Sequence, residues 1–345
     1  MYIMGQILFL FCVFIFSILI TRLVRKYSLR NALIDIPNER SLHDQPTPRG
    51  GGLSIVLASL TSFLLMYYFE LITLDILLAL LSGGSIVAVI GWLDDHRHIS
   101  PVIRGLIYTA AAIITLMILG GLPSINVGKH YLTIPLFNNI VAVFGIVWLI
   151  NLYNFMDGAD AFAAIQTICV CLFLGLLFLL SGQHGLAVIN FIVVMATAGF
   201  LYWNWPPARI FMGDVGSCFI GFFFGSQIII SEKSDSVTAV VFLILLGVFI
   251  CDATFTLIMR IVKNEKWYSA HKSHAYQRIV QMGMSHKQLV LSLLVINVFF
   301  LWPMAYIAFR WEQLSILLLI FEVLVLFILW VRIQIRYNRF KVLEG

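Results

Sequence analysis

Residues 76–95 read ILLALLSGGSIVAVIGWLDD. The first eighteen carry no charge and the last two are aspartates. A membrane crossing needs about 20 mostly apolar residues. Because backbone in lipid must satisfy its own hydrogen bonds, a run of this kind predicts a membrane-spanning helix. The stretch therefore predicts a membrane fold and places negative charge at a helix end.

The composition of the whole chain agrees with this interpretation. Of its 345 residues, 61% are hydrophobic and 11% are charged, whereas a soluble domain carries about 25% charge. Glycine, proline or charge separates eleven apolar runs, near residues 3–22, 51–69, 76–93, 102–121, 135–151, 160–181, 185–203, 216–231, 237–262, 287–309 and 313–333. We expect an all-α, polytopic membrane protein of about eleven helices, forming a single domain over residues 1–345.

The positions of lysine and arginine predict the orientation of the spans. With the N-terminus outside and the C-terminus in the cytoplasm, only Lys129, Lys233 and Arg310 fall in outer loops, so 19 of the 22 basic residues are inside. Cytoplasmic loops carry such an excess. The net charge of +5 then needs no nucleic-acid partner, because basic loops face anionic lipid headgroups.

Polar residues concentrate in the inner loops, at residues 23–50, 94–101, 151–160, 204–216 and 263–286. These loops carry carboxylate, amide, imidazole and guanidinium groups, while the outer loops are short and plain. Polar groups near a bilayer are costly and usually functional. We therefore expect an active site at the cytoplasmic face.

Two acidic motifs are the first candidates. Asp94 and Asp95 close an apolar run, where a helix C-terminus disfavours negative charge, so a cation is expected beside them; a solvated helix end is the alternative. Asn154, Asp157 and Asp160 are three residues apart and would share one helix face. The alternative is that one of these aspartates caps the following helix.

Glycine and basic residues complete the set. Gly213-Asp214-Val-Gly216-Ser217 precedes an apolar run; such a helix start can bind phosphate, and Asp214 would hold a phosphate-bound Mg²⁺. Arg49-Gly-Gly-Gly52 could bend around an anion or be a flexible helix entry. His271, His274 and Arg278 suit phosphate better than zinc, because cysteine partners are missing. Together these groups resemble a phosphoryl-transfer site.

Two carboxylates fall inside apolar runs. Asp252 and Arg260 are eight residues apart, so they would share a helix face and could form a structural pair, and catalysis by Asp252 is the alternative. Glu322 has no partner or role that the sequence indicates.

Four motifs carry a family resemblance: Pro46-Thr-Pro-Arg-Gly-Gly-Gly52, Gly91-Trp-Leu-Asp-Asp95, Asn154-Phe-Met-Asp-Gly-Ala-Asp160 and Phe211-Met-Gly-Asp-Val-Gly-Ser217. In order and spacing they resemble the polyprenyl-phosphate N-acetylhexosamine-1-phosphate transferases, glycosyltransferase family 4, over nearly the whole chain.

The resemblance implies a reaction at the bacterial inner membrane. A UDP-N-acetylhexosamine would give its sugar-1-phosphate to undecaprenyl phosphate, leaving a lipid diphosphate sugar and UMP. This is the priming step of O-antigen, in lipopolysaccharide biosynthesis, or of another cell-envelope polysaccharide. The cofactor would be Mg²⁺, with Mn²⁺ as a substitute. The resemblance leaves the oligomeric state open, a homodimer among the alternatives.

The resemblance also implies roles for residues. Asp94 and Asp95 correspond to the pair associated with the lipid phosphate or with general-base work, and Asp214 to the Mg²⁺ aspartate. Asn204 matches an asparagine of the nucleotide pocket. The other implied site residues are Asn154 beside the metal, Asp157 and Asp160 in the catalytic group, and Arg49, His271, His274 and Arg278 on the nucleotide sugar or its phosphates.

One motif departs from the family pattern. Many members carry His-x-His-His in the last large inner loop, where this chain reads His274-Ala-Tyr-Gln277. This resembles the branch that primes some O-antigen chains with sugars such as N-acetylfucosamine or N-acetylquinovosamine, so the sugar stays open. A transporter or flippase of lipid-linked or anionic substrates is the alternative function, although polar groups midway through the membrane and repeated halves, which transporters show, are not evident here.

Overall fold

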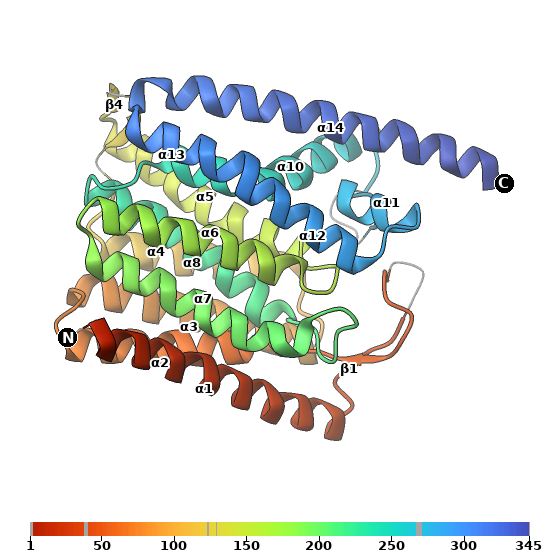
Figure 1. Cartoon of the computed structure of the whole chain (residues 1–345), viewed down its shortest axis with the longest axis horizontal. Helices are drawn as coiled ribbons and strands as arrows, with labels where there is room; N and C mark the ends of the chain where they lie inside the picture. Colours follow the sequence, from red (N-terminus) through yellow and green to blue (C-terminus); the bar gives the residue numbers. More distant parts are fainter. Residues whose placement is uncertain (1–2, 38–40, 123, 129, 267–270, 345) are drawn as a thin grey trace.

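Figure 1 shows the computed structural model of the chain as a bundle of helices that run side by side. The structure describes residues 3–37, 41–122, 124–128, 130–266 and 271–344. Parts of the expected inner loops 23–50 and 263–286, as well as Lys129 of the orientation argument, lie outside the described residues.

Helices make up nearly all of the regular structure, which confirms the all-α prediction. Strands occur in the described ranges only as two short antiparallel pairs, β1 with β2 and β3 with β4. In chain order the elements are α1 (Ile3–Arg30), β1 (Ile34–Asp35), β2 (Thr47–Pro48), α2 (Leu53–Tyr68), α3 (Leu74–His96), α4 (Pro101–Ile118), β3 (Ile125–Val127), β4 (His130–Leu132), α5 (Pro135–Phe155), α6 (Phe162–Leu180), α7 (His184–Asn204), α8 (Asp214–Lys233), α9 (Ala239–Leu245), α10 (Gly247–Val262), α11 (Ala275–Gln281), α12 (His286–Ile296), η1 (Asn297–Leu301), α13 (Trp302–Arg310), η2 (Glu312–Leu314) and α14 (Ser315–Glu344).

Every predicted apolar run coincides with one helix or with two or three consecutive helices. Nine of the described helices are long and apolar enough to cross a membrane, or up to ten if the bent pair α9 and α10 is one span. The remaining run is α2, whose 16 residues reach about 24 Å, less than the roughly 30 Å hydrocarbon core. The polytopic membrane fold is thus confirmed, while the count of eleven and the orientation stay predictions.

A sharp bend separates α9 from α10, at 78°. Here Gly247 lies against Glu322 of α14, and a Cβ on Gly247 would be 1.8 Å from Glu322 Oε1. Glu322 is fully buried, and neither carboxyl oxygen has a hydrogen-bond partner among the described residues. The glutamate without a predicted role therefore lies at the bend, where only glycine leaves it room.

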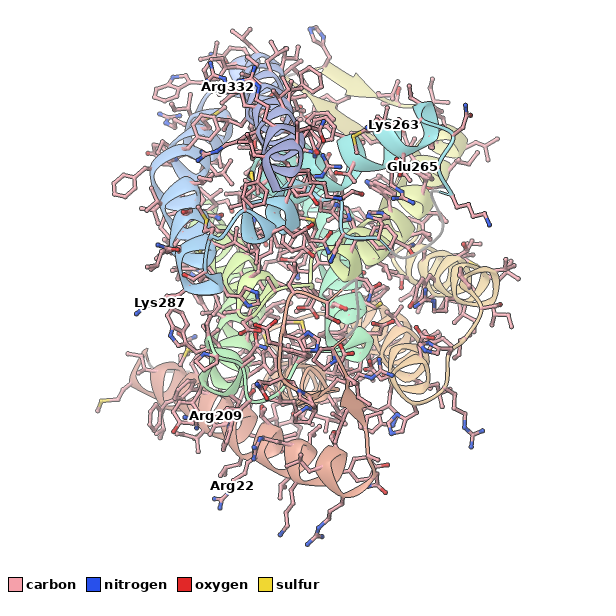
Figure 2. All side chains as sticks on the ribbon, turned by 90° about the vertical axis from the view of Figure 1, so that its right-hand side faces the viewer. Arg22, Arg209, Lys263, Glu265, Lys287 and Arg332 are labelled. Carbon is pink, nitrogen blue, oxygen red and sulfur yellow. The ribbon has the colours of Figure 1, made fainter. Side chains whose placement is uncertain are left out.

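The segments expected to form the site lie at one end of the bundle, which we call the site end. Figure 1 shows α11, β1 and the C-terminus at this end, and the N-terminus and β4 at the other. Figure 2 looks onto the site end, where the labelled cations Arg22, Arg209, Lys263, Lys287 and Arg332 are spread over the face. Helix α8 runs through the centre, with 89% of its apolar window buried, and it begins at the site end.

Candidate active site

A cavity of about 150 Å³ opens at the site end, between α3, the α5–α6 turn, the segment before α8 and the start of α12. Its wall carries five carboxylates, one guanidinium and two imidazoles. The polar lining residues are Asp35, His43, Arg49, Asp95, Asn154, Asp157, Asp160, Asn204, Asp214 and His286. The cavity therefore joins most of the predicted site residues, from loops that are distant in sequence.

The adjacent aspartates Asp94 and Asp95 have different partners. Asp94 accepts a hydrogen bond from the backbone of Ile99 at 2.7 Å and forms an ion pair with Arg104. Asp95 is 1% exposed, faces the cavity, and accepts from the backbone amides of Asp214 and Val215 at 3.1 and 3.3 Å. The cation that helix polarity predicts beside Asp94 is thus Arg104, and Asp95 is stabilised by the N-terminus of α8.

The start of α8 requires the glycine that precedes it. Gly213 has a φ of +75°, and a Cβ there would lie 2.6 Å from Asp95 Oδ2. The glycine therefore lets the carboxylate of Asp95 reach the first amides of the helix. The anion expected at this helix start is, in the structure, a side chain of the protein itself.

Asp214 is the residue on which three helices converge. Its Oδ1 accepts from Asn154 Nδ2 of α5 at 2.8 Å, and its Oδ2 lies 2.9 Å from Arg104 Nη1 of α4. The same Arg104 nitrogen contacts Asp94 of α3. One guanidinium thus bridges the aspartate at the end of α3 and the one at the start of α8, which makes Arg104 a site residue that the sequence did not single out.

Replacing Arg104 by alanine is expected to lower the free energy of unfolding by about 2 kcal/mol, because two carboxylates lose their shared partner in a half-buried place. Arg104→Lys keeps the charge but offers a compact ammonium in place of a planar fork, and should recover only part of the loss. Thermal unfolding in detergent measures both. Arg97→Ala, an exposed arginine seven residues away, is the control, and an Arg104→Ala protein as stable as Arg97→Ala would contradict the bridging role.

The Asn154–Asp160 motif reaches the cavity without sharing a helix face. Asn154 lies in the last turn of α5, while Asp157 and Asp160 lie in the turn before α6, so the helical prediction for this motif is wrong. Neither aspartate caps α6, whose N-cap is Ala161. The chain leaves the helix at Met156, and the tight turn directs all three side chains to the cavity.

Asp160 has its own set of partners. Its Oδ2 accepts from the backbone amide of Ala208 at 3.1 Å and lies 3.2 Å from Nδ1 of His286. His286 is the first residue of α12, after the helix-capping Ser285. The Ser285-x-x-Gln288 capping box could have located this helix start from the sequence, but nothing in the sequence showed that His286 would reach Asp160.

Asn204 and Arg49 also line the cavity. Both polar atoms of the Asn204 amide are used on backbone: Nδ2 donates to Ile210 at 2.9 Å and Oδ1 accepts from Ala161 at 2.8 Å. Asn204 therefore ties the segment before α8 to the start of α6. Arg49 donates to the backbone carbonyl of Asp95, which fixes the loop before α2 to the end of α3.

The glycines after Arg49 pack against protein backbone. Gly51 and Gly52 donate to the carbonyls of Phe211 and Met212 at 2.9 and 2.8 Å. A Cβ on Gly52 would lie 2.4 Å from the Cα of Gly216. The two glycine motifs recognised in the sequence are thus partners in one close backbone contact, which positions the start of α8.

The basic cluster near α11 lies beside the cavity and does not line it. Burial, and next the neighbouring His274, lower the pKa of His271 to about 3, so His271 is neutral. The guanidinium of Arg278 lies 4.7 Å from the ring centre of Tyr337. The structure does not bring His271, His274 and Arg278 to the cavity wall, and phosphate binding by them stays a prediction.

The described contacts do not give the expected structural pair of Asp252 and Arg260. Arg260 Nη1 lies 2.9 Å from Glu265 Oε2, whereas Asp252 lies 3.8 Å from His274 Nδ1 and accepts from the backbone of α11. The prediction failed because a shared helix face says nothing of a neighbouring segment that competes for the carboxylate.

The donor atoms around the cavity suit a hard divalent cation. Burial, followed by the charges of Asp214, Asp95 and Asp160, raises the pKa of Asp157 well above its usual value, and a cation would relieve that repulsion. Among the described residues, however, no three acidic, histidine or cysteine side chains are placed to hold an ion alone. Mg²⁺ fits this arrangement, since it usually takes one or two carboxylates together with water and substrate phosphates.

Several cavity residues were not predicted individually. Asp35 follows α1 in β1, and His43 lies in the same inner loop, edge-on to Phe211 at 4.8 Å between ring centres. The pairing of β1 with β2 brings Asp35 beside Thr47 and so carries this loop over the cavity. Two-residue strands of this kind leave no periodic signal in a sequence.

Known proteins of similar sequence cover the part of the chain that holds the acidic motifs. Residues 77–232, which include the three acidic motifs, match the model of glycosyl transferase family 4. The chain is 28% identical, over 94% of its length and 90% of the relative's, to a probable undecaprenyl-phosphate N-acetylglucosaminyl 1-phosphate transferase of Bacillus subtilis. It is 29% identical, over 78% and 73%, to the decaprenyl-phosphate N-acetylglucosaminephosphotransferase of Mycolicibacterium smegmatis. The undecaprenyl-phosphate alpha-N-acetylglucosaminyl 1-phosphate transferase of Escherichia coli O157:H7 is 25% identical, over 81% and 77%. The chain thus resembles glycosyl transferase family 4 over residues 77–232, and it is similar to these transferases over most of both chains.

Proposed function

We propose that this protein transfers a sugar-1-phosphate of the N-acetylhexosamine type from a UDP-sugar to undecaprenyl phosphate, giving a lipid diphosphate sugar and UMP. The observation that carries the proposal is the acidic cavity at one end of a bundle of apolar helices. It supports a reaction between a charged, water-soluble donor and a lipid whose phosphate lies at the membrane surface. The names of the relatives support this reaction.

The reaction proceeds by direct in-line attack. An oxygen of the lipid phosphate bonds to the β-phosphorus of the UDP-sugar, and the bond from that phosphorus to the bridging oxygen breaks. The electron pair leaves with UMP, and the sugar stays on the phosphate that is now joined to the lipid. No covalent enzyme intermediate is needed, since the chain only has to hold the two reactants in line.

Asp95 is the member of the aspartate pair that steers the lipid phosphate, because it faces the cavity while Asp94 is occupied by Arg104 and Ile99. Asp94 therefore acts through Arg104. Arg49 and His286 lie on the cavity wall, where the guanidinium of Arg49 offsets the negative charge of the donor. Asp157 and Asp160 belong to the donor side, next to the turn that Asn204 anchors.

Mg²⁺ would be held by Asp214 and Asn154 together with phosphate oxygens of the donor. It would supply a positive charge that stabilises the UMP leaving group. Charge supports its presence: the cavity wall has five carboxylates but only one guanidinium, so a diphosphate needs a cation to enter. Mn²⁺, with similar ligand preferences, would substitute.

The cavity faces the cytoplasm in this proposal, in a multi-pass protein of the bacterial inner membrane. The gathering of basic residues at the site end supports this orientation. The relatives' names favour UDP-N-acetylglucosamine as the donor to test first. The loss of two histidines at Tyr276 and Gln277 leaves the 6-deoxy sugars, and an O-antigen pathway, as the second choice.

The test is UMP release by the purified protein in nanodiscs. UMP should appear from UDP-N-acetylglucosamine only when undecaprenyl phosphate is added, EDTA should abolish it, and Mg²⁺ should restore it. Replacing the donor by a panel of UDP-N-acetylhexosamines identifies the sugar. The transporter alternative finds no support in the comparisons, and it predicts donor uptake into proteoliposomes without UMP, which would overturn the proposal.

A further inference from the structure

The intramembrane carboxylate of Asp252 is bonded to a segment that belongs to the site end. It lies in α10, is 7% exposed, and accepts from the backbone amides of Ala275 and Tyr276 at 2.7 and 3.1 Å. Thr256 also donates to its Oδ1, at 3.2 Å. A carboxylate that binds two amides at the start of a helix fixes both the position and the direction of that helix, here the short helix α11.

Helix α11 also contacts the turn between α5 and α6, through Tyr276. The Tyr276 hydroxyl donates to the backbone carbonyl of Phe155 at 3.0 Å, and its ring stacks on Phe162 with 4.8 Å between ring centres. A Cβ on Gly158 would lie 2.3 Å from this hydroxyl oxygen. Tyr276 therefore contacts the chain at Phe155 before the donor-side aspartates, at Gly158 between them and at Phe162 after them.

The aromatic part of this contact is buried, with Tyr276 at 3% and Phe162 at 2% exposure. Burial, and next the charge of Asp252, raise the pKa of Tyr276 above its usual value, so the hydroxyl keeps its proton and remains a donor. The turn directly follows Asn154, which donates to Asp214, and it contains Asp157, which lines the cavity. A displacement of Tyr276 would therefore shift both side chains relative to Asp214.

We propose that Asp252 and Tyr276 are positioning residues for the proposed transfer reaction: Asp252 fixes α11, and Tyr276 holds the 155–158 turn so that Asn154 and Asp157 face the cavity. The inference rests on the proposed function but concerns residues outside the cavity wall. It also gives the carboxylate of α10 a role, since it connects a helix beyond the 78° bend with the acidic turn.

Tyr276→Phe is the cleanest test, because it removes one hydrogen bond and keeps the stacked ring. We expect kcat to fall about 10-fold, the upper range for one hydrogen bond, with the KM for lipid acceptor unchanged. Asp252→Ala should lower kcat more, by about 100-fold, since misplacement of reacting groups has that order of effect. Asp252→Asn should fall between wild type and alanine, because its carbonyl can accept from only one of the two amides.

A second readout does not depend on activity. Amide hydrogen exchange of a peptide covering residues 154–162 should become about 10-fold faster in Tyr276→Phe, the change that loss of one hydrogen bond allows, and exchange in α8 should not change. Tyr131→Phe and Asp75→Asn, at the opposite end of the bundle, are the matched controls. The double variant Asp252→Asn/Tyr276→Phe should lose no more activity than the worse single variant, because both act on one route.

Three outcomes would overturn the inference: wild-type kcat in Tyr276→Phe, a lower kcat without faster exchange in residues 154–162, or faster exchange throughout the protein. If Asp252→Ala does not fold, Tyr276→Phe decides alone. A wild-type protein that releases no UMP contradicts the proposed function instead, and the exchange experiment then still decides whether Tyr276 holds the turn.

Discussion

Replacement of Asp214 by asparagine is expected to lower kcat about 10³-fold, or about 4 kcal/mol of transition-state stabilisation. Asp214 is the carboxylate on which Asn154 and Arg104 converge, at the N-terminus of the central helix α8. Asparagine has the same shape but no charge, so it would hold a cation beside the phosphates more weakly than the carboxylate does. UMP release at saturating donor and lipid measures the effect.

The stability of the Asp214→Asn protein distinguishes chemistry from folding. Loss of a carboxylate relieves repulsion from Asp95 but removes a partner of Arg104, so we expect the thermal midpoint to change little. Asp235→Asn, beyond the far end of α8, is the matched control. Normal turnover of Asp214→Asn in Mg²⁺ would exclude Asp214 as the residue that holds the metal.

Gly52→Ala is expected to destabilise the fold by about 3 kcal/mol, at the upper end for forced overpacking. A Cβ at this position would lie 2.4 Å from the Cα of Gly216 and 2.8 Å from its nitrogen. Backbone on both sides cannot move aside as a flexible side chain could. Since Gly52 has a φ of −61°, which alanine adopts freely, the effect would be purely steric.

Gly105→Ala provides the control for this prediction. Gly105 is also in a helix, α4, but a Cβ there meets nothing within 4 Å. Alanine should therefore stabilise that helix by about 0.5 to 1 kcal/mol. The thermal midpoints of the two variants in the same detergent are the measurement, and equal midpoints would show that α2 and α8 can separate without loss of stability.

The spans of this fold could be predicted because lipid imposes a simple length rule. The bend between α9 and α10 could not. Gly247 is one of 24 glycines, and it marks the bend only because Glu322 of α14 fills the space beside it. A contact between helices 75 positions apart leaves no local pattern. For the same reason the pairing of β1 with β2 was not foreseen.

Residue chemistry predicted much of the site, but not which side chain does what. Asp95, Asp157, Asp160 and Asp214 do reach one cavity. The difference between Asp94 and Asp95 depends on Arg104, which approaches from another helix. The histidines of the 271–278 segment were assigned to phosphate binding from their charge alone. Their actual position depends on the direction of α11, which Asp252 sets.

His286 and Asp35 were not predicted as site residues for the same reason. His286 was only the first residue of an expected span, and Asp35 an acidic residue in a basic loop. Each reaches the cavity through tertiary contacts, such as that of His286 with Asp160. Which of the polar loop side chains line the cavity depends on the backbone around them, and the sequence does not reveal that backbone.

The hydrogen bonds between Asp95 and the start of α8 can form only after α8 has been synthesised. The amide that Asp95 binds belongs to a residue 119 positions later, which at about 5 to 20 residues per second takes a ribosome roughly 6 to 24 s to reach. Until then Asp95 lacks that amide, whereas Asp94 already has Ile99 and Arg104 as partners. Water at the helix end must solvate Asp95 meanwhile, so a chain released before α8 has one carboxylate without its amide partners and an incomplete cavity.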